Sequence, residues 1–259
     1  MTTVKLIVTI KNRAEHFIQS IPFLLSQYGI DYELIIVDYH SNDGFNEILI
    51  SETELRKPTF SPFLKKIHVI RLTEDLKFNL TKARNLGPAF FSEGGQVYCF
   101  TDIDTFLSMN YLKFWSDKVV KNKTFTTSRK QESRASLPSR LRAEVNGGNC
   151  CVYSDDFFEI RGYDESMLSW GGDDDDLYHR LKLVGLREIN PYNANDALQY
   201  SILHGEELRL KYLEVPERAP KQETFDKIYL NQSIENNNSD FLKPEYASSI
   251  ATMQELYRK

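Results

Sequence analysis

The fold is decided between residues 4 and 38, where the sequence reads VKLIVTIKNRAEHFIQSIPFLLSQYGIDYELIIVD. Residues 4–10 and 32–37 are short apolar runs rich in β-branched side chains, which is typical of strands buried on both faces. Between these runs, the apolar residues of 15–28 recur at helical spacing. A strand, a helix and a strand in this order predict two parallel strands joined by a right-handed crossover.

The next part of the chain repeats this alternation. Residues 67–72 and 97–100 have the composition of two more strands, and residues 81–91 have that of a helix. We therefore expect an α/β fold with a Rossmann-like, mostly parallel sheet flanked by helices. The first strand is not followed by Gly-x-Gly-x-x-Gly, which argues against an oxidoreductase that uses a dinucleotide.

Ligands of such sheets bind beyond the carboxyl ends of the strands, where this sequence is polar and acidic. The residues there are Asn12 and Arg13, Asp38 to Asp43, and Thr101 to Asp104. From about residue 110 the regular pattern weakens, and residues 124–144, rich in Ser, Arg and Lys, predict a mobile loop. Past Pro216 the chain becomes polar, with a linker expected at 235–240 and a last amphipathic helix at 245–257.

Composition narrows the class of protein. A net charge of −5 without a long basic run argues against nucleic acid as the main partner. The first apolar run is too short for a secretory signal, and no stretch is long enough to span a membrane, so we expect no transmembrane segment and a cytoplasmic location. The 3 cysteines, Cys99, Cys150 and Cys151, are too few for a disulfide framework and lack the spaced partners of a zinc site. We interpret them as small buried hydrophobic residues.

Two acidic motifs carry the chemistry. Asp102 and Asp104 follow the strand at 97–100 and could direct both carboxylates to one cation, although a solvated turn with a helix cap at Thr105 explains this pair equally well. The second motif is Trp170-Gly-Gly followed by four acids, Asp173 to Asp176. Acids at a helix N-terminus are favoured by its dipole, which is the plain structural explanation. The alternative is that the glycines admit a ligand, Trp170 faces a sugar ring, and one carboxylate is a general base.

Five segments in this order resemble those of the A-type (GT-A) nucleotide-sugar glycosyltransferases. They are residues 37–44, 82–85, 101–104, 147–149 and 170–176. The last segment is most similar to the Trp-Gly-Gly-Glu-Asp-Asp-Asp motif of the β-1,4-galactosyltransferases and of the galactosaminyltransferase domains of chondroitin-type polymerases. The resemblance covers roughly residues 4–205 and implies a GT-A fold with a fused acceptor-binding part.

The resemblance also implies a role for each site residue. It implies that Asp174 is the catalytic base and that a metal ion, Mn²⁺ or Mg²⁺, is held by Asp104, His204 and Asp102. The implied donor-binding residues are Arg13, Asp38, Asp43, Arg84, Asp102 and Gly148, and the implied acceptor-binding residues are Trp170, Gly172, Asp173 and Asp175. Asp173 stands where the family has Glu, so its contact with the acceptor is expected to differ.

The function implied is an inverting, metal-dependent transfer of Gal, GalNAc or GlcNAc from a UDP-sugar to a saccharide or lipid-linked saccharide. Residues 1–105 would then bind the nucleotide-sugar, residues 106–215 would bind the acceptor and carry out catalysis, and residues 216–259 would form the polar linker and the last helix. We expect a place in bacterial surface polysaccharide synthesis, with peripheral contact to the inner face of the membrane as a further expectation.

Two other classes of protein remain as alternatives. A phosphatase of the haloacid dehalogenase type would use Asp102 as its nucleophile, but it leaves Asp38, Asp43 and Arg84 without a role. A non-catalytic sugar-binding module does not explain why acids typical of a metal site and of a general base occur together.

Overall fold

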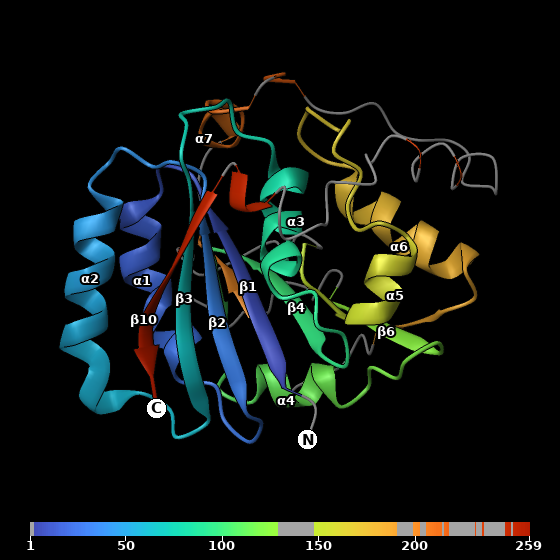
Figure 1. Cartoon of the computed structure of the whole chain (residues 1–259), viewed down its shortest axis with the longest axis horizontal. Coiled ribbons are helices and arrows are strands. Elements are labelled where there is room, and N and C mark those ends of the chain that lie inside the picture. Colours follow the sequence, from blue (N-terminus) through green and yellow to red (C-terminus); the bar gives the residue numbers. More distant parts are fainter. Residues whose placement is uncertain are drawn as a thin grey trace, which may run out of the picture.

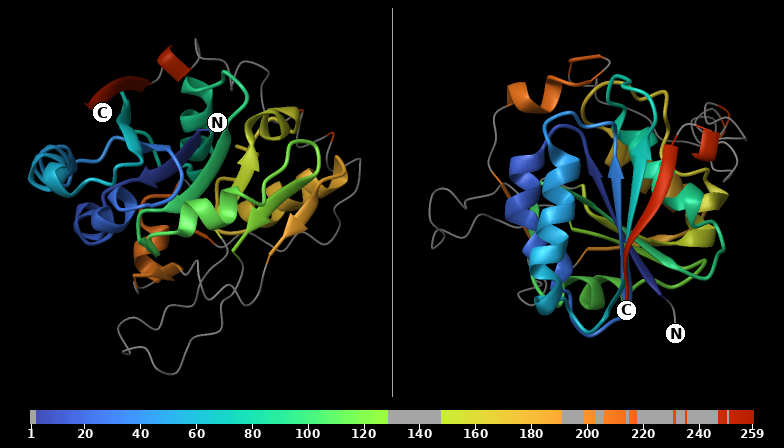
Figure 2. Two further views of the ribbon diagram at one scale, coloured as in Figure 1. Left: turned by 90° about the horizontal axis from the view of Figure 1, so that it is seen from below. Right: turned by 60° about the vertical axis from the view of Figure 1, so that its left-hand side comes forward.

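The computed structural model describes residues 3–128, 148–190, 199–202, 206–213, 215–217, 231, 235, 247–249 and 251–259. Within these residues, an 8-stranded sheet in the order β10-β3-β2-β1-β4-β7-β6-β8 forms the middle layer, and a 2-stranded sheet joins β5 and β9. Helices cover both faces of the large sheet (Figure 1, Figure 2). The predicted α/β architecture is therefore confirmed.

The centre of the sheet is parallel, as the opening stretch predicts. It consists of β1 (Val4–Ile10), β2 (Tyr32–Asp38), β3 (Leu64–Leu72) and β4 (Val97–Asp102). β1 lies between β2 and β4 and pairs in parallel with both. Every residue of β1 and β2 is buried, which explains why their sequences are apolar runs rather than alternating patterns.

Three helices connect these strands. They are α1 (Ala14–Leu25), α2 (Phe45–Arg56), followed by the short 3-10 helix Lys57–Thr59, and α3 (Leu80–Phe90). α1 and α2 cover one face of the sheet and α3 covers the other (Figure 2). Alternate residues of β1 belong to the hydrophobic cores on opposite faces of the sheet. Leu6 and Val8 share one core with Phe17 of α1, and Ile7 shares the other with Leu86 of α3.

The second half of the described chain builds the side of the sheet beyond β4, and its last strand, β10, extends the β3 edge. Its elements are β5 (Thr105–Leu107), α4 (Tyr111–Ser116), β6 (Thr124–Thr127), β7 (Cys150–Tyr153), α5 (Ser154–Glu159), α6 (Asp173–Leu183), β8 (Arg187–Ile189), β9 (Gln199–Ser201), α7 (Glu206–Leu210) and β10 (Ala251–Arg258). β7 is antiparallel to both β4 and β6, so the sheet is parallel from β3 to β4 and mixed beyond β4. The prediction of a mobile loop at 124–144 is wrong for Thr124–Thr127, which form the buried strand β6; residues 129–144 lie outside the described residues.

The predicted C-terminal helix at 245–257 is wrong for residues 251–257, whereas residues 247–249 are helical. Residues 251–258 form β10, which pairs antiparallel with β3 and lies at the end of the strand order. The physical reason is that β3 would otherwise be an edge strand with unpaired backbone groups, and an added strand satisfies them. The ring of Tyr257 also packs edge-on against Phe60, with 4.9 Å between the ring centroids. Of the predicted linker at 235–240, only Glu235 is described.

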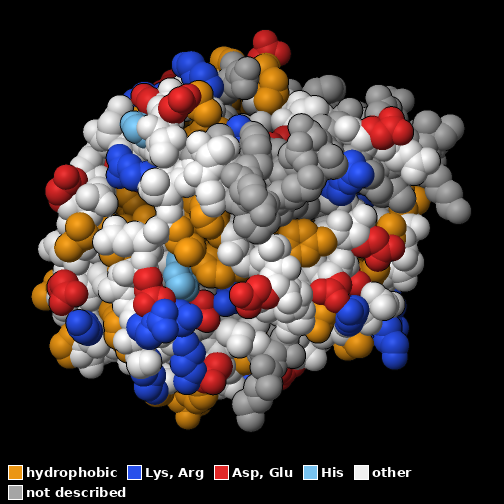
Figure 3. Space-filling view, in the orientation of Figure 1, with side chains coloured by type: hydrophobic (Ala, Val, Ile, Leu, Met, Phe, Trp, Pro, Cys, Tyr) orange, Lys and Arg blue, Asp and Glu red, His pale blue; other side chains and the backbone are white. Residues whose placement is uncertain are grey.

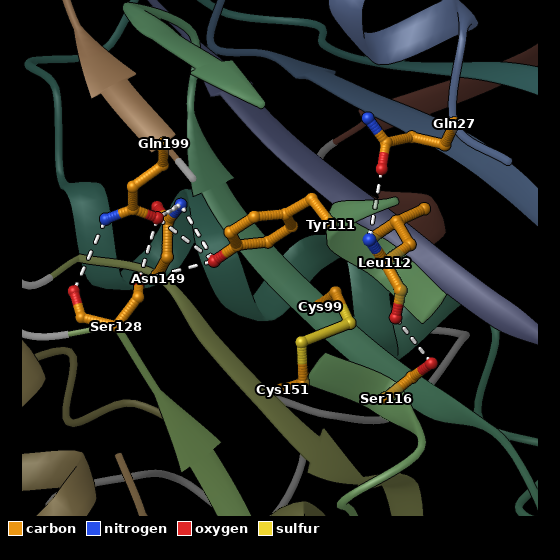
Figure 4. Close-up of a disulfide and its surroundings, with 9 residues drawn as sticks. All are labelled: Gln27, Cys99, Tyr111, Leu112, Ser116, Ser128, Asn149, Cys151 and Gln199. Carbon is orange, nitrogen blue, oxygen red and sulfur yellow. Dashed lines mark hydrogen bonds between the residues drawn. A yellow bond between two sulfur atoms is a disulfide. The ribbon is translucent and has the colours of Figure 1, made fainter. Parts of the chain in front are cut away.

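The cysteines are buried, as predicted, but two of them are bonded. Cys99 of β4 and Cys151 of β7 face each other in the strand register and form a disulfide, with Cα atoms 4.2 Å apart (Figure 4). The interpretation of these two as plain hydrophobic residues is therefore wrong. Their sequence separation of 52 residues gave no indication of the pair, because register between distant strands is a tertiary property.

The surface and the helices add two further observations. None of the helices in the described part of the chain combines the length and the hydropathy that crossing a membrane requires. On the face shown in Figure 3, the described Lys and Arg side chains lie among Asp and Glu side chains. Opposite charges that alternate in this way produce only a weak long-range field on this face.

Candidate active site

The first group of predicted site residues lies at the carboxyl ends of β1 and β2. Asp43 accepts a hydrogen bond at 2.9 Å from the backbone N of Ala14, the first residue of α1. Arg13 donates from Nη2 to the backbone O of Leu208 at 2.6 Å. These contacts fix the backbone at the end of β1 and at the start of α1.

Asp38 ends β2 and is buried. Its Oδ1 accepts from the backbone N of Ser41 at 2.8 Å, and its Oδ2 lies 3.0 Å from Nη1 of Arg71 on β3. Burial raises the pKa of Asp38, and the bonds to Ser41 and the charge of Arg71 oppose the shift. Arg71 also donates to the backbone O of Ser41 at 2.9 Å, so it holds the loop after β2.

Two residues of this group were not assigned a role from the sequence. Asn12 and His40 have positive φ angles of 52° and 56°, and they follow β1 and β2 closely. The side chain of Asn12 accepts from the backbone N of Asn42 at 2.8 Å, which joins the two loops. Residues other than glycine adopt this conformation rarely, and such positions cluster at functional sites.

The second group is a cluster of charges around Arg84, which we call the Arg84 cluster: Arg84, Asp102, Asp173 and Asp174. Nη1 of Arg84 donates to Asp173 Oδ2 at 2.6 Å and to Asp174 Oδ1 at 2.7 Å, and Nη2 donates to Asp102 Oδ1 at 2.9 Å. The side chain of Arg84 is only 2% exposed. The structure thus joins the predicted acid at the end of β4 to the acids at the start of α6.

The backbone of Gly171 and Gly172 explains why the acids reach Arg84. Both glycines have φ of 90°, a conformation that strains residues with a side chain, and α6 begins immediately afterwards. Asp173 and Asp174 in the first helical turn therefore bind Arg84 of α3.

The four acids of this motif have three different environments. Asp173 and Asp174 pair with Arg84, whereas Asp176 forms a buried pair with Arg180, and Asp175 is exposed. One explanation therefore does not fit the whole run of acids. The helix dipole is the plain structural explanation for some of them, and a shaped site is the explanation for those that pair with Arg84.

The charges of the Arg84 cluster are perturbed. Burial raises the pKa of Asp174 well above its usual value and raises that of Asp173, and the guanidinium of Arg84 opposes both shifts. Burial alone would lower the pKa of Arg84, but the surrounding carboxylates, Asp174 foremost, raise it well above its usual value. Asp174 thus combines burial, a charged partner and a raised pKa, a combination that is frequent at functional sites.

Gly148 lies against this cluster. A Cβ at Gly148 would be 2.9 Å from Asp102 Oδ2, 3.1 Å from Arg84 Nη2 and 3.5 Å from Asp174 Oδ2. Only a glycine leaves this space open beside the two carboxylate oxygens. Gly148 therefore borders the Arg84 cluster.

The chemistry of the donor set fits a divalent cation. Carboxylate oxygens are the ligands that Mg²⁺ and Mn²⁺ prefer, and Asp102 directs Oδ2 to the space that Gly148 leaves open. Asp104 lies two residues further on, and its backbone O accepts from Ile202 N at 2.6 Å. His204 lies outside the described residues, and within them no three His, Cys, Asp or Glu side chains are grouped as a metal site.

The predicted acceptor residues differ in exposure. Trp170 is half-buried, and its backbone N donates to Glu217 O at 3.0 Å. Asp175 is exposed, whereas the side chain of Asp173 is only 8% exposed and is bound to Arg84. The side chains of Trp170 and Asp175 are therefore more accessible to an acceptor than the side chain of Asp173 is.

The sequence gave little indication of the residues that pack behind the Arg84 cluster. Asn85, next to Arg84, donates to Tyr163 O and to Glu165 Oε1, both at 2.8 Å, and accepts from Tyr163 N at 2.9 Å. The ring of Tyr163 lies under the guanidinium of Arg84, 5.1 Å from its Cζ. Burial raises the pKa of Glu165 to about 8, and its bond to Asn85 opposes the shift. The adjacency of Asn85 to Arg84 is the one signal that the sequence offered.

Comparison with known proteins gives matches among the glycosyltransferases. Residues 132–204 match the family model described as the N-terminal domain of galactosyltransferase. Human β-1,4-galactosyltransferase 4 is 28% identical over 139 residues, which are 50% of this chain and 38% of the relative. The chain therefore matches well under half the length of this relative.

Solved structures share the fold at low sequence identity. A mannosyltransferase of Pyrobaculum calidifontis, in complex with GDP-Man and Mn²⁺, superposes with a TM-score of 0.54 at 19% identity, over 73% of this chain and 55% of the other. The catalytic domain of Drosophila β-1,4-galactosyltransferase 7, in complex with xylobiose, gives 0.51 at 15% identity, over 92% and 82% of the two chains.

The fold is therefore that of the GT-A glycosyltransferases, and the predicted fold class is confirmed. Part of the chain is similar in sequence to the β-1,4-galactosyltransferases, in agreement with the resemblance read from the sequence. The alternative of a phosphatase gains no support from these matches.

Proposed function

We propose that the chain is an inverting glycosyltransferase that moves Gal, GalNAc or GlcNAc from a UDP-sugar to a saccharide hydroxyl with the help of Mn²⁺ or Mg²⁺. The observation that carries the proposal is the Arg84 cluster, in which Asp102, at the carboxyl end of β4, shares a guanidinium with Asp174, at the start of α6. An acid of metal-binding type and an acid with a raised pKa are thereby held side by side.

Asp174 is the proposed base. Its side chain is 25% exposed, and while Oδ1 is fixed by Arg84, Oδ2 faces the space beside Gly148. A carboxylate held in this way can take the proton of an acceptor hydroxyl as that hydroxyl attacks the sugar. Attack from the face opposite the leaving diphosphate inverts the anomeric carbon.

Asp102 and Asp104, with His204, are the residues that would hold the metal. When bound, a divalent cation neutralises the charge that develops on the departing diphosphate. Manganese in the mannosyltransferase with the same fold supports this assignment. Arg84 is too buried to reach a diphosphate directly, so we propose that it orients the acids and that the donor contacts come from other residues.

The positions of the remaining residues suggest where the nucleobase and the acceptor would bind. Arg13, Asp38 and Asp43 fix the loops after β1 and β2, where we propose that the nucleobase binds. Trp170, Gly172 and Asp175 would contact the acceptor, and Asp173 would orient its neighbour Asp174 through Arg84. We keep the division into a donor part at 1–105 and an acceptor part at 106–215 as a proposal.

The acceptor is proposed to be a saccharide, free or lipid-linked, of a bacterial surface polysaccharide, assembled at the cytoplasmic face of the membrane. The likeness of the Trp170 motif to that of chondroitin-type polymerases supports a growing polysaccharide as acceptor. The Drosophila galactosyltransferase domain of the same fold, in complex with xylobiose, supports a saccharide.

The test is the variant Asp174→Asn, which keeps the shape of the side chain but cannot take a proton. We expect kcat to fall by about 10²-fold or more, while calorimetry shows unchanged binding of UDP with Mn²⁺. Asp117→Asn is the control, because the carboxylate of Asp117 is 47% exposed and pairs with Lys113, outside the proposed site. This variant is expected to transfer sugar at a near wild-type rate. Transfer by Asp174→Asn at the wild-type rate would mean that the base is another residue.

A further inference from the structure

A buried polar cluster lies beside the disulfide and carries no role in the reaction proposed above. Its centre is Gln199, which is 2% exposed. Oε1 of Gln199 accepts from Tyr111 OH at 3.0 Å, from Ser128 Oγ at 2.7 Å and from Asn149 Nδ2 (Figure 4). Nε2 of Gln199 donates to the backbone O of Ser128 at 3.3 Å. We call these four residues the Gln199 cluster.

The Gln199 cluster joins segments that are distant in the sequence. Tyr111 is the first residue of α4, Ser128 follows β6, Asn149 precedes β7, and Gln199 begins β9. All four residues are at most 3% exposed, so the donors and the acceptor have no water to replace a lost partner. One carbonyl oxygen therefore fixes three other segments.

Two of these segments border the acids of the proposed metal site. Asn149 directly follows Gly148, which lies against Asp102, and the backbone O of Asn149 accepts from Ser128 N at 3.2 Å. β9 pairs antiparallel with β5, and the pairing is extended by Ile202 N, which donates to the backbone O of Asp104 at 2.6 Å. The Gln199 cluster is thus connected by backbone to both sides of Asp102 and Asp104.

We infer that Gln199 is a positioning residue that sets the distance between Gly148 and Asp104, and thereby the opening in which the metal and the diphosphate bind. The inference rests on the proposed function for its metal and nucleotide, but the geometry on which it depends belongs to the chain alone. A change of a few tenths of an ångström at Gly148 matters because that residue already lies against Asp102 and Arg84.

A matched control separates positioning from general stability. Gln27 is another buried glutamine, 0% exposed, which donates to Phe23 O and Ser108 O, both at 2.9 Å, and accepts from Leu112 N at 3.0 Å. It has a similar number of bonds, but it joins α1 to α4 and touches none of the predicted site residues. Gln27→Met and Gln199→Met should therefore lower thermal stability to a similar extent.

The experiment compares Gln199→Met, Gln199→Glu and Gln27→Met with the wild type. Amide hydrogen exchange in metal-free protein should become about tenfold faster at Ile202 and Ser128 in Gln199→Met and remain unchanged there in Gln27→Met. Calorimetry should show that Gln199→Met weakens Mn²⁺-dependent UDP binding by about 10- to 100-fold, as changes behind a metal site typically do. Gln199→Glu keeps an acceptor for the three donors. Burial favours the protonated form of Glu, whose O–H can replace the donor to Ser128 O, so this variant should restore most of both quantities.

The outcomes distinguish the two proposals. Equal exchange and equal UDP affinity in Gln199→Met and Gln27→Met would overturn the positioning role. A wild-type protein that binds no UDP with Mn²⁺ would overturn the proposed function, while the exchange measurement at Ile202 and Ser128 would still decide whether Gln199 holds the two segments.

Discussion

Replacing Arg84 by Met tests the central contact of the site. The substitution removes the guanidinium that Asp102, Asp173 and Asp174 share and keeps most of the side-chain volume. The carboxylate of Asp102 is 40% exposed and contributes little, so the cost comes mainly from Asp173 and Asp174, which are 8% and 25% exposed. Removing one partner of a buried pair costs about 3–5 kcal/mol, and we expect a loss of about 3 kcal/mol at neutral pH.

The loss should depend on pH in a defined direction. Burial already raises the pKa values of Asp173 and Asp174, and without Arg84 the charge that opposes this shift is lost. The folded variant then holds protons that the unfolded chain has released, so its stability falls as the pH rises through this range. The difference from the wild type should be smaller at pH 5 than at pH 8.

Urea unfolding at both pH values measures this, with Arg180→Met as the control. Arg180 is 0% exposed and forms a comparable pair with Asp176, whose side chain is 1% exposed, but it does not contact Asp174 in the Arg84 cluster. Both variants should be destabilised, and only Arg84→Met should lose sugar transfer. An Arg84→Met protein that unfolds at the wild-type urea concentration, or one that transfers sugar as well as Arg180→Met, would refute the reasoning.

Three further predictions concern single positions. Gly148→Ala should weaken Mn²⁺-dependent UDP binding measured by calorimetry by about tenfold, because the new methyl would lie 2.9 Å from Asp102 Oδ2; an unchanged affinity would place the nucleotide elsewhere. The free energy of unfolding of Glu165→Gln, relative to that of the wild type, should rise by at least about 1 kcal/mol from pH 5 to pH 8. The reason is that folded Glu165, with a pKa of about 8, keeps its proton where the unfolded chain loses it. A difference between the two proteins in urea unfolding that is the same at both pH values would contradict this. Asp104→Ala and His204→Ala should each reduce the Mn²⁺-dependent part of UDP binding by about tenfold or more, and retention of that part in both variants would exclude them as ligands.

Much of the fold of residues 4–102 could be predicted because its signals are local. Strands buried on both faces must be apolar throughout, and a helix with one buried face must show its periodicity, so residues 4–38 are sufficient to indicate a parallel pair and its crossover. The acids at the end of β4 and at the start of α6 could be found in the same way, since glycines and clustered carboxylates are costly unless a site uses them. Their order along the chain then indicated the family.

The partners of those acids could not be predicted from the sequence. Arg84 pairs with Asp174 across 90 residues, and Cys99 meets Cys151 only because β4 and β7 are antiparallel in one particular register. Residues 251–258 have a pattern that also suits a helix, and the unpaired edge of β3 decides that they form a strand. The sequence by itself determined which residue types are present and which local structures they favour. Only the tertiary structure decided which charges meet, because the energy of a buried ion pair or of a strand pairing depends on the partner that folding brings within a few ångströms.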